Sequence, residues 1–162
     1  MKKHLLNLWR DYWKNPSIKA GEEFEDEVAD EFFPDDLYEM LHRTHDVNTN
    51  RKRFIRSSLN PDFQFEIRGS KIQFWVECKH RENNTDSSLI KVFKEGQLRR
   101  YQQFPNSFLL LCTYRYEYEY MYFVPFSEIK WDNLYMSFLK PYELTLDPPV
   151  MPGLIKKYLS KP

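Results

Sequence analysis

The sequence predicts an α/β fold in which a mixed central sheet is flanked by helices. Residues 63–68 and 71–79 are rich in aromatic and β-branched side chains, and the turn-like residues between them indicate a hairpin. Residues 17–33 and 89–104 have apolar side chains at helical spacing. The apolar run at 107–113 follows the second helix, as is typical of a buried strand parallel to its neighbour after a crossover.

The chain has no internal repeat and no long linker, so we interpret residues 1–162 as one domain. Its core is expected at about 17–130. Residues 2–14 have the spacing of an amphipathic helix, which adds to this core. The Pro-rich tail at 141–162 ends in a short basic helix and is a second addition.

The first helix, at 17–33, ends before Pro34. Residues 37–45 fit a helix or a strand, and we favour a strand. A polar, basic connection covers 46–60. The apolar stripe of the helix recurs every four residues and consists of Phe24, Val28 and Phe32.

The second hairpin strand carries the residues of greatest chemical interest. Successive side chains of a strand point to opposite faces. One face therefore receives Ile72, Phe74, Val76 and Cys78. The opposite face receives Gln73, Trp75, Glu77 and Lys79.

The second half of the chain predicts a crossover helix and shorter elements. The helix at 89–104 has a core side, although Gly96 weakens the pattern. The tyrosine-rich residues 114–122 predict a turn, and 121–126 predict a further strand. Residues 127–139 predict a short helix.

Composition indicates a globular protein, with 17% aromatic and 30% charged residues. Lys and Arg number 24 and so do Asp and Glu, so net charge alone does not favour a nucleic-acid partner. Cys78 and Cys112 lie in apolar strand patterns, which favours buried thiols in a reducing compartment over a disulfide or zinc site. No apolar run is long enough for a membrane span and no secretory signal is recognisable, so we expect a cytoplasmic protein.

A tight hairpin would bring Asp62 opposite the end of the second strand, close to Glu77 and Lys79. Magnesium prefers oxygen ligands and commonly takes one or two carboxylates, and the Cys78 carbonyl could supply a further oxygen. Lys79 would orient the attacking water or neutralise charge on phosphorus. These roles belong together in phosphodiester hydrolysis. The alternative is a solvated strand face with a weak ion pair.

The helix at 17–33 has an unusual density of acidic residues. Glu25 lies near an edge of the buried stripe, whereas Glu22 and Asp26 should point outward. A carboxylate at the buried edge could reach a metal site, and the alternative is a solvated acidic face.

The connection before Asp62 contains a cluster of basic residues and no Glu. This cluster could bind phosphates. The alternative is a solvated loop. In the second helix Gln97 and Tyr101 share a face, with Arg99 and Arg100 beside them. The basic cluster consists of Arg43, Arg51, Lys52, Arg53 and Arg56, with His42 and His45.

These pieces together resemble the PD-(D/E)xK nuclease superfamily. The motif reads Pro61-Asp62…Glu77-Cys78-Lys79. Upstream, Gly21-x-x-x-Glu25 is similar to the helix-borne glutamate of archaeal Holliday-junction resolvases and Mrr-type restriction enzymes. Downstream, Gln97-Leu-Arg-Arg-Tyr101 is similar to the Gln-x-x-x-Tyr motif of RecB-like nucleases. The matches span residues 21–115.

The resemblance implies a restriction-endonuclease-like α/β/α sandwich and a Mg²⁺ or Mn²⁺ cofactor. Asp62 and Glu77 would be metal ligands and Lys79 the catalytic lysine. Glu25 would bind the metal directly or through water, and Glu23 or Glu27 could replace it if the helix is rotated. Gln97 would position Lys79 or the substrate. Arg99, Arg100 and Tyr101 are further candidate contacts to nucleic acid.

The leading hypothesis is a metal-dependent nuclease that hydrolyses DNA in restriction, repair or recombination. Members of the superfamily are frequently dimers, and a homodimer would help so small a chain engage both strands. A second hypothesis is a noncatalytic nucleic-acid-binding or protein-interaction module that retains the fold. A third is a structural ion-pair cluster in an unrelated α/β domain, in which Glu25, Asp62, Glu77 and Lys79 do not come together.

Overall fold

The computed structural model describes residues 18–44, 59–82, 88–115 and 118–161. The expected helix at 2–14 lies outside these residues, and so does most of the basic connection. Four of the predicted nucleic-acid contacts therefore have no structural description, namely Arg51, Lys52, Arg53 and Arg56.

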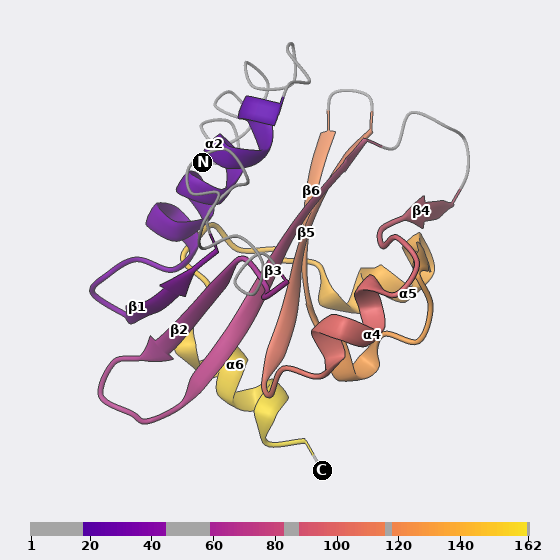
Figure 1. Ribbon diagram of the computed structural model, residues 1–162. Helices are drawn as coiled ribbons and strands as arrows, with labels where there is room; N and C mark the ends of the chain where they lie inside the picture. The colour runs from indigo at the N-terminus through magenta and orange to yellow at the C-terminus, as the bar shows by residue number, and fades with distance from the viewer. Residues whose placement is uncertain (1–17, 45–58, 83–87, 116–117, 162) are drawn as a thin grey trace.

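A five-stranded mixed sheet forms the centre of the structure, with strand order β1-β2-β3-β5-β6 (Figure 1). Strands β1, β2 and β3 are successive antiparallel neighbours, β5 runs parallel to β3, and β6 is antiparallel to β5. The prediction of a mixed sheet is confirmed. Its strands are β1 (Tyr38–Arg43), β2 (Phe63–Ile67), β3 (Gln73–Glu82), β5 (Ser107–Arg115) and β6 (Tyr118–Pro125).

Helix α2 (Ile18–Glu27) continues as one π-helical turn (Val28–Phe32) and covers one face of the sheet. The predicted apolar stripe of Phe24, Val28 and Phe32 is buried there. Beyond Pro34 the chain turns into β1, which confirms the strand preferred for 37–45.

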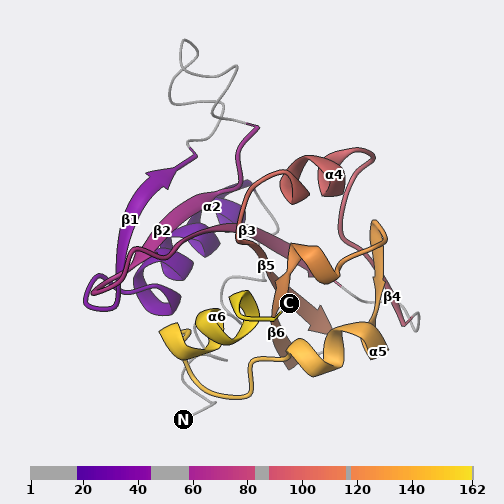
Figure 2. The same cartoon turned by 90° about the horizontal axis from the view of Figure 1, so that it is seen from below.

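The C-terminal tail completes the same face. Helix α6 (Pro152–Leu159) buries Ile155 in the cluster that α2 forms with the sheet, as Figures 1 and 2 show from two sides. Val150 is buried beside it, and the Tyr38 hydroxyl donates a hydrogen bond to its carbonyl. The tail therefore contributes to the hydrophobic core and is not merely an addition to it.

The opposite face carries helix α4 (Gln97–Gln102), a two-stranded sheet and two short turns of helix. Its buried cluster takes residues from β5 and β6 but none from β1 or β2. The sheet is thus flanked by helices on both sides, but the second layer covers only part of it. The remaining elements are β4 (Leu89–Lys91), β7 (Asn133–Tyr135), α5 (Met136–Leu139) and the 3₁₀ turns Phe126–Glu128 and Lys140–Tyr142.

The prediction of one helix at 89–104 was wrong in its first half. Residues 89–91 form β4, and α4 begins only after Gly96, whose φ of 81° lies in the left-handed region. Strand β4 exists because it pairs with β7, which comes much later in the chain. Local periodicity does not reveal such a long-range partner.

Two further predictions were also wrong. Residues 127–139 were expected to be a helix, but they contain a 3₁₀ turn, β7 and the short α5. The tyrosine-rich residues 114–122 were expected to be a turn, but β5 extends to Arg115 and β6 begins at Tyr118. Tyrosine is a favourable strand residue, and the paired strands β5 and β6 use it as such.

No helix among the described residues is long and apolar enough to cross a membrane.

Candidate functional site

The candidate site lies where β2 begins and β3 continues past it. The β2–β3 ladder ends at the pair Phe63 and Val76, so β3 has no β2 partner beyond that point. Asp62 precedes β2, and its Oδ2 accepts a 2.7 Å hydrogen bond from the Cys78 backbone N–H. The Asp62 carboxylate thus takes a ladder position that β2 leaves open.

The carbonyl of Cys78 points to the same side as Asp62. Within a strand, the N–H and C=O of one residue point to the same side, and successive residues alternate. The Cys78 N–H reaches Asp62, whereas the Trp75 N–H donates to the Asn106 carbonyl next to β5. The Cys78 carbonyl is therefore directed into the open position, as the proposed metal site requires.

Thr44 holds the Pro61–Asp62 backbone in place. Its N–H donates a 2.8 Å hydrogen bond to the Asp62 carbonyl, and its hydroxyl donates one of 2.8 Å to the Pro61 carbonyl. A ring nitrogen of His42 lies 3.2 Å from the same hydroxyl. Nothing in the sequence pattern identified Thr44, because the contact joins the residue after β1 to the residues before β2, which are far apart in the chain.

Glu77 and Lys79 form a buried ion pair on the predicted common face of β3. The Lys79 Nζ lies 2.7 Å from the Glu77 Oε1, and the side chains are 14% and 4% exposed. The second oxygen of Glu77, Oε2, is buried with no hydrogen-bond partner among the described residues. A buried carboxylate oxygen without a partner is costly, so a ligand at this position would stabilise the site.

The charges around Asp62 also favour a bound cation. Burial raises the pKa of Asp62 well above its usual value, and the nearby charges of Glu77 and Glu25 raise it further. The Cys78 N–H and the Lys79 ammonium act in the opposite direction and lower this pKa. The Asp62 carboxyl therefore experiences the charges of two further carboxylates and one ammonium, and a bound divalent cation would relieve the repulsion among the carboxylates.

Glu25 is the acidic residue of α2 that acts on Asp62, whereas Glu23 and Glu27 do not appear among the groups that shift its pKa. The Glu25 side chain is 26% exposed and lies 3.9 Å from Arg43. Arg43 pairs more closely with Asp26, at 2.5 Å, and the Asp26 side chain points outward as predicted, with 60% exposure. Arg43 thus lies at the rim of the site in an ion pair with the helix.

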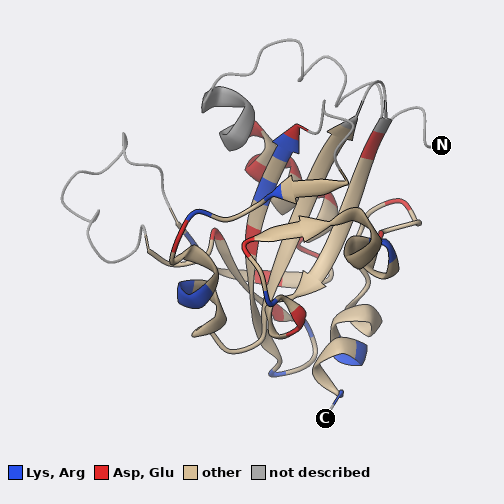
Figure 3. Cartoon of the chain, turned by 90° about the vertical axis from the view of Figure 1, so that its right-hand side faces the viewer, with Lys and Arg blue, Asp and Glu red and all other residues tan. Residues whose placement is uncertain are grey.

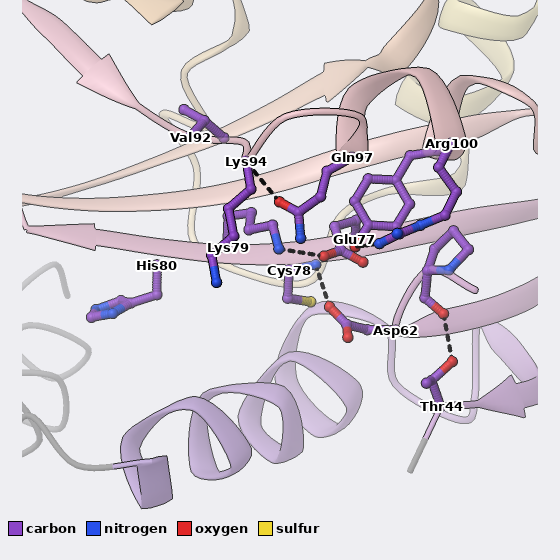
Figure 4. A network of polar contacts seen from close by, with 12 residues as sticks. Thr44, Asp62, Glu77, Cys78, Lys79, His80, Val92, Lys94, Gln97 and Arg100 are labelled. Atoms are coloured by element: carbon purple, nitrogen blue, oxygen red, sulfur yellow. Dashed lines mark hydrogen bonds and ion pairs between the residues drawn. The ribbon is translucent and has the colours of Figure 1, made fainter. Parts of the chain in front are cut away.

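Helix α4 supplies the remaining predicted residues. Gln97 accepts a 2.9 Å hydrogen bond from the Lys94 N–H, and its side chain points toward the Lys79–Glu77 pair in Figure 4. Tyr101 is only 5% exposed, and its ring centroid lies 5.7 Å from the Lys79 Nζ. Burial raises the pKa of Tyr101, and so do the charge of Glu77 and a side-chain hydrogen bond between Tyr101 and the Glu77 carboxylate. The buried Tyr101 ring therefore packs beside the Lys79 ammonium, and Tyr101 is not an exposed contact to nucleic acid as predicted.

The two arginines of α4 differ. Arg99 is exposed, whereas Arg100 is half-buried and donates a 3.3 Å hydrogen bond to the Tyr101 hydroxyl. The Arg100 guanidinium carbon lies 5.0 Å from the centroid of the Tyr101 ring, and its Nε is buried without a partner among the described residues. Arg100 is thus the α4 arginine that borders the site.

Arg81 is a further residue that sequence reasoning missed. It follows Lys79 on the same face of β3 and donates hydrogen bonds of 3.0 and 2.6 Å to the carbonyls of Lys91 and Val92. These bonds tie the segment that leads into Gln97 to the strand that carries Lys79. The alternation of β3 could have suggested its orientation, but not its partners.

The donor set fits magnesium or manganese better than zinc. It offers the carboxylates of Asp62 and Glu77 and the Cys78 carbonyl, all hard oxygen ligands, and leaves positions for water and phosphate. Burial and three nearby carboxylates raise the pKa of the Cys78 thiol well above its usual value, which disfavours a thiolate ligand. In the described part of the chain, no three His, Cys, Asp or Glu side chains form a preassembled metal-binding group. Two carboxylates with a carbonyl do not require one.

The described Lys and Arg residues lie on several elements of the chain. Figure 3 shows Lys and Arg interspersed with Asp and Glu along the ribbon, in keeping with the overall neutral composition.

Comparison of the chain with family models, curated proteins and solved structures finds no match.

Proposed function

We propose that this protein is a Mg²⁺- or Mn²⁺-dependent nuclease of the PD-(D/E)xK type that hydrolyses phosphodiester bonds in DNA. The observation that carries the proposal is the buried Oε2 of Glu77, which lacks a partner among the described residues and lies beside Asp62. Such an oxygen, next to a carboxyl group whose pKa is raised by burial and by neighbouring carboxylates, has the character of a cation ligand.

The arrangement of elements supports the restriction-endonuclease-like fold. Helix α2 is followed by the antiparallel strands β1, β2 and β3, then by α4, and then by β5 parallel to β3. Glu25 lies on α2, Asp62 directly precedes β2, and Glu77 and Lys79 lie on β3, and this order supports the proposal.

Asp62, Glu77 and the Cys78 carbonyl would hold the metal ion, with Glu25 acting directly or through a water molecule. A metal ion held in this way supplies an acidified water and polarises a phosphoryl oxygen. Two carboxylates and a backbone carbonyl would offer hard oxygen ligands to such a cation, and two of these residues are already joined by the hydrogen bond from the Cys78 N–H to Asp62.

Lys79 would neutralise negative charge on the phosphorus in the transition state. Its ammonium is held by Glu77 and lies near the ring of Tyr101, so it needs little reorganisation when charge develops. Gln97 would position Lys79, since its side chain points toward the ion pair (Figure 4). The free thiols Cys78 and Cys112 suit a cytoplasmic enzyme, and a homodimer would allow both strands of a duplex to be cut.

The test is cleavage of supercoiled, linear and four-way-junction DNA with Mg²⁺ or Mn²⁺, comparing the wild type with Asp62→Ala. We expect metal-dependent cleavage that Asp62→Ala abolishes. Glu66→Ala is the matched control, because it removes a carboxylate of β2 that pairs with Gln73 away from the site. This control should cut like the wild type.

Two results would contradict the proposal. One is full activity in a folded Asp62→Ala protein. The other is a wild type that neither cuts DNA nor shows heat of Mg²⁺ binding by calorimetry. The second result would favour a noncatalytic module or a structural ion-pair cluster.

A further inference from the structure

Beside the candidate site, part of the sheet face is not covered by the other elements that the structure describes. The layer that contains α4 draws its buried residues from β5 and β6 and none from β1 or β2. On this face the register aligns His42 with Gln64 and Gln64 with Trp75, so the three side chains form a row across β1, β2 and β3. All three are only partly buried.

Aromatic rings gather along this row. The ring centroids of Trp75 and Phe104 are 4.9 Å apart, and those of His42 and Trp75 are 5.7 Å apart. None of these three residues belongs to either buried core cluster. We call His42, Trp75 and Phe104 the ring row. It is an aromatic surface and not part of the hydrophobic interior.

The ring row borders the candidate metal site at Trp75 and at His42. Trp75 and Glu77 are two residues apart on the same face of β3, which corresponds to about 6.8 Å along the strand. A ring nitrogen of His42 contacts the Thr44 hydroxyl that holds Pro61. A nucleotide next to the cleaved phosphate would therefore lie over these rings.

The chemistry of the ring row suits bases and not a phosphate backbone. Its members and the neighbouring Gln64 and Gln73 offer rings and amides but no Lys or Arg, and Gln73 donates a hydrogen bond to the Glu66 carboxylate, an anion that disfavours a phosphate there. In a duplex the bases are stacked inside and the phosphates face outward, so an uncharged aromatic surface meets little that it can bind. An unpaired base offers its π-face to aromatic side chains.

We propose that the ring row binds an unpaired nucleobase next to the scissile phosphodiester, so that the preferred substrate has a single-stranded end, flap or branch. The inference rests on the proposed nuclease function, because that function defines where the cleaved bond lies. It goes further by naming the substrate class and the residues that select it.

The test is fluorescence anisotropy with a labelled single-stranded oligonucleotide and with a blunt duplex of the same sequence, in EDTA at fixed salt. We expect the wild type to bind the single strand more tightly. Trp75→Ala should weaken that binding about tenfold or more, because loss of one base–aromatic stack typically has an effect of this size. Trp75→Phe should retain most of the affinity.

Trp131→Ala is the matched control, since Trp131 is 60% exposed and is not one of the ring-row residues. It should leave the affinity unchanged. Phe104→Ala provides a second test of the ring row in case Trp75→Ala folds poorly. Single-strand binding unchanged in a folded Trp75→Ala or Phe104→Ala protein would overturn the proposal, and so would tighter binding of the blunt duplex by the wild type.

The same proteins separate this inference from the proposed function. Metal-dependent cleavage together with unchanged single-strand binding in Trp75→Ala would disprove the ring-row inference and support the nuclease function. Single-strand binding that requires Trp75, without cleavage under any metal condition, would support the ring row as a binding surface and disprove the nuclease function.

Discussion

Two groups of charged side chains flank the start of β2, and each contains two carboxylates and one cation. The inner group is Asp62, Glu77 and Lys79, and the rim group is Glu25, Asp26 and Arg43. Their shortest ion pairs are nearly equal in length, at 2.7 Å for Glu77–Lys79 and 2.5 Å for Asp26–Arg43. Their exposures differ greatly, at 4% and 14% for the inner pair and 60% and 29% for the rim pair.

The comparison shows that burial, and not distance, sets the chemistry of these groups. Exposed ion pairs are screened by water and typically contribute about 0–1 kcal/mol to stability. Buried charges lose their hydration and depend on their partners, so removing one partner costs much more. The inner group also contains the carboxylate oxygen without a partner among the described residues and the carboxyl with the strongly raised pKa. Metal chemistry is therefore expected to centre on the inner group, with Glu25 as the rim carboxylate whose charge acts on Asp62.

The largest effect on stability is expected from Lys79→Met. The change leaves the buried Glu77 carboxylate without its cation and next to Asp62, so the free energy of unfolding should fall by about 3–5 kcal/mol without metal. Mg²⁺ should restore part of this loss, because the ion takes over the neutralisation. Urea unfolding at neutral pH, with and without Mg²⁺, measures both effects.

Lys71→Met is the control for Lys79→Met, because Lys71 is exposed in the β2–β3 turn. The double variant Glu77→Gln/Lys79→Met should be more stable than Lys79→Met alone, since it removes the unpaired charge. A Lys79→Met protein as stable as the wild type would show that the inner group is effectively solvated.

An intermediate effect is expected at His80, which packs against Phe24 at a centroid distance of 5.8 Å. Burial lowers the pKa of His80 from 6.5 to about 4, and the positive charge of Arg81 adds to the shift. The unfolded chain therefore binds this proton more readily than the folded one. The stability contribution is fully present above about pH 6.5 and is lost as the pH falls toward about 4.

We expect His80→Gln to reduce the loss of stability between pH 7 and pH 4.5 by an amount on the order of 1–3 kcal/mol. Carboxylates titrate in both proteins, so the difference between the two curves isolates His80. Urea unfolding at several pH values provides the measurement. Parallel curves for the two proteins would mean that His80 is accessible to water in the folded state.

The smallest effect is expected at the rim. Arg43→Gln should lower the free energy of unfolding by about 1 kcal/mol or less, and a double-mutant cycle with Asp26→Asn should give a coupling of about 0.2–1 kcal/mol. The coupling should shrink in high salt. A coupling well above 1 kcal/mol that resists salt would place Arg43 with the inner group and erase the contrast between them.

Much of the fold was predictable where local periodicity reports the final contacts. The stripe of Phe24, Val28 and Phe32, the hairpin of β2 and β3, and the buried parallel β5 all follow from residue spacing. Residues 89–91 and 133–135 were assigned to helices, because their strand pairing links distant parts of the chain and leaves little local signal. The C-terminal tail was unreadable for a similar reason, since α6 acquires its role only by packing on the sheet.

For the candidate site, the sequence by itself determined which side chains share a face of β3 and which helix position borders the core. Alternation along the strand and the helical stripe are local properties of the chain. Only the tertiary structure decided that β3 continues beyond the end of its pairing with β2, and that the Asp62 carboxylate accepts a hydrogen bond from the Cys78 N–H there. It also decided that Thr44 and Arg81 donate hydrogen bonds to the backbone of segments next to the site. It also decided the raised pKa of Asp62 and the unpartnered oxygen of Glu77. Both depend on how much water the surrounding elements exclude, and that is a property of the assembled layers.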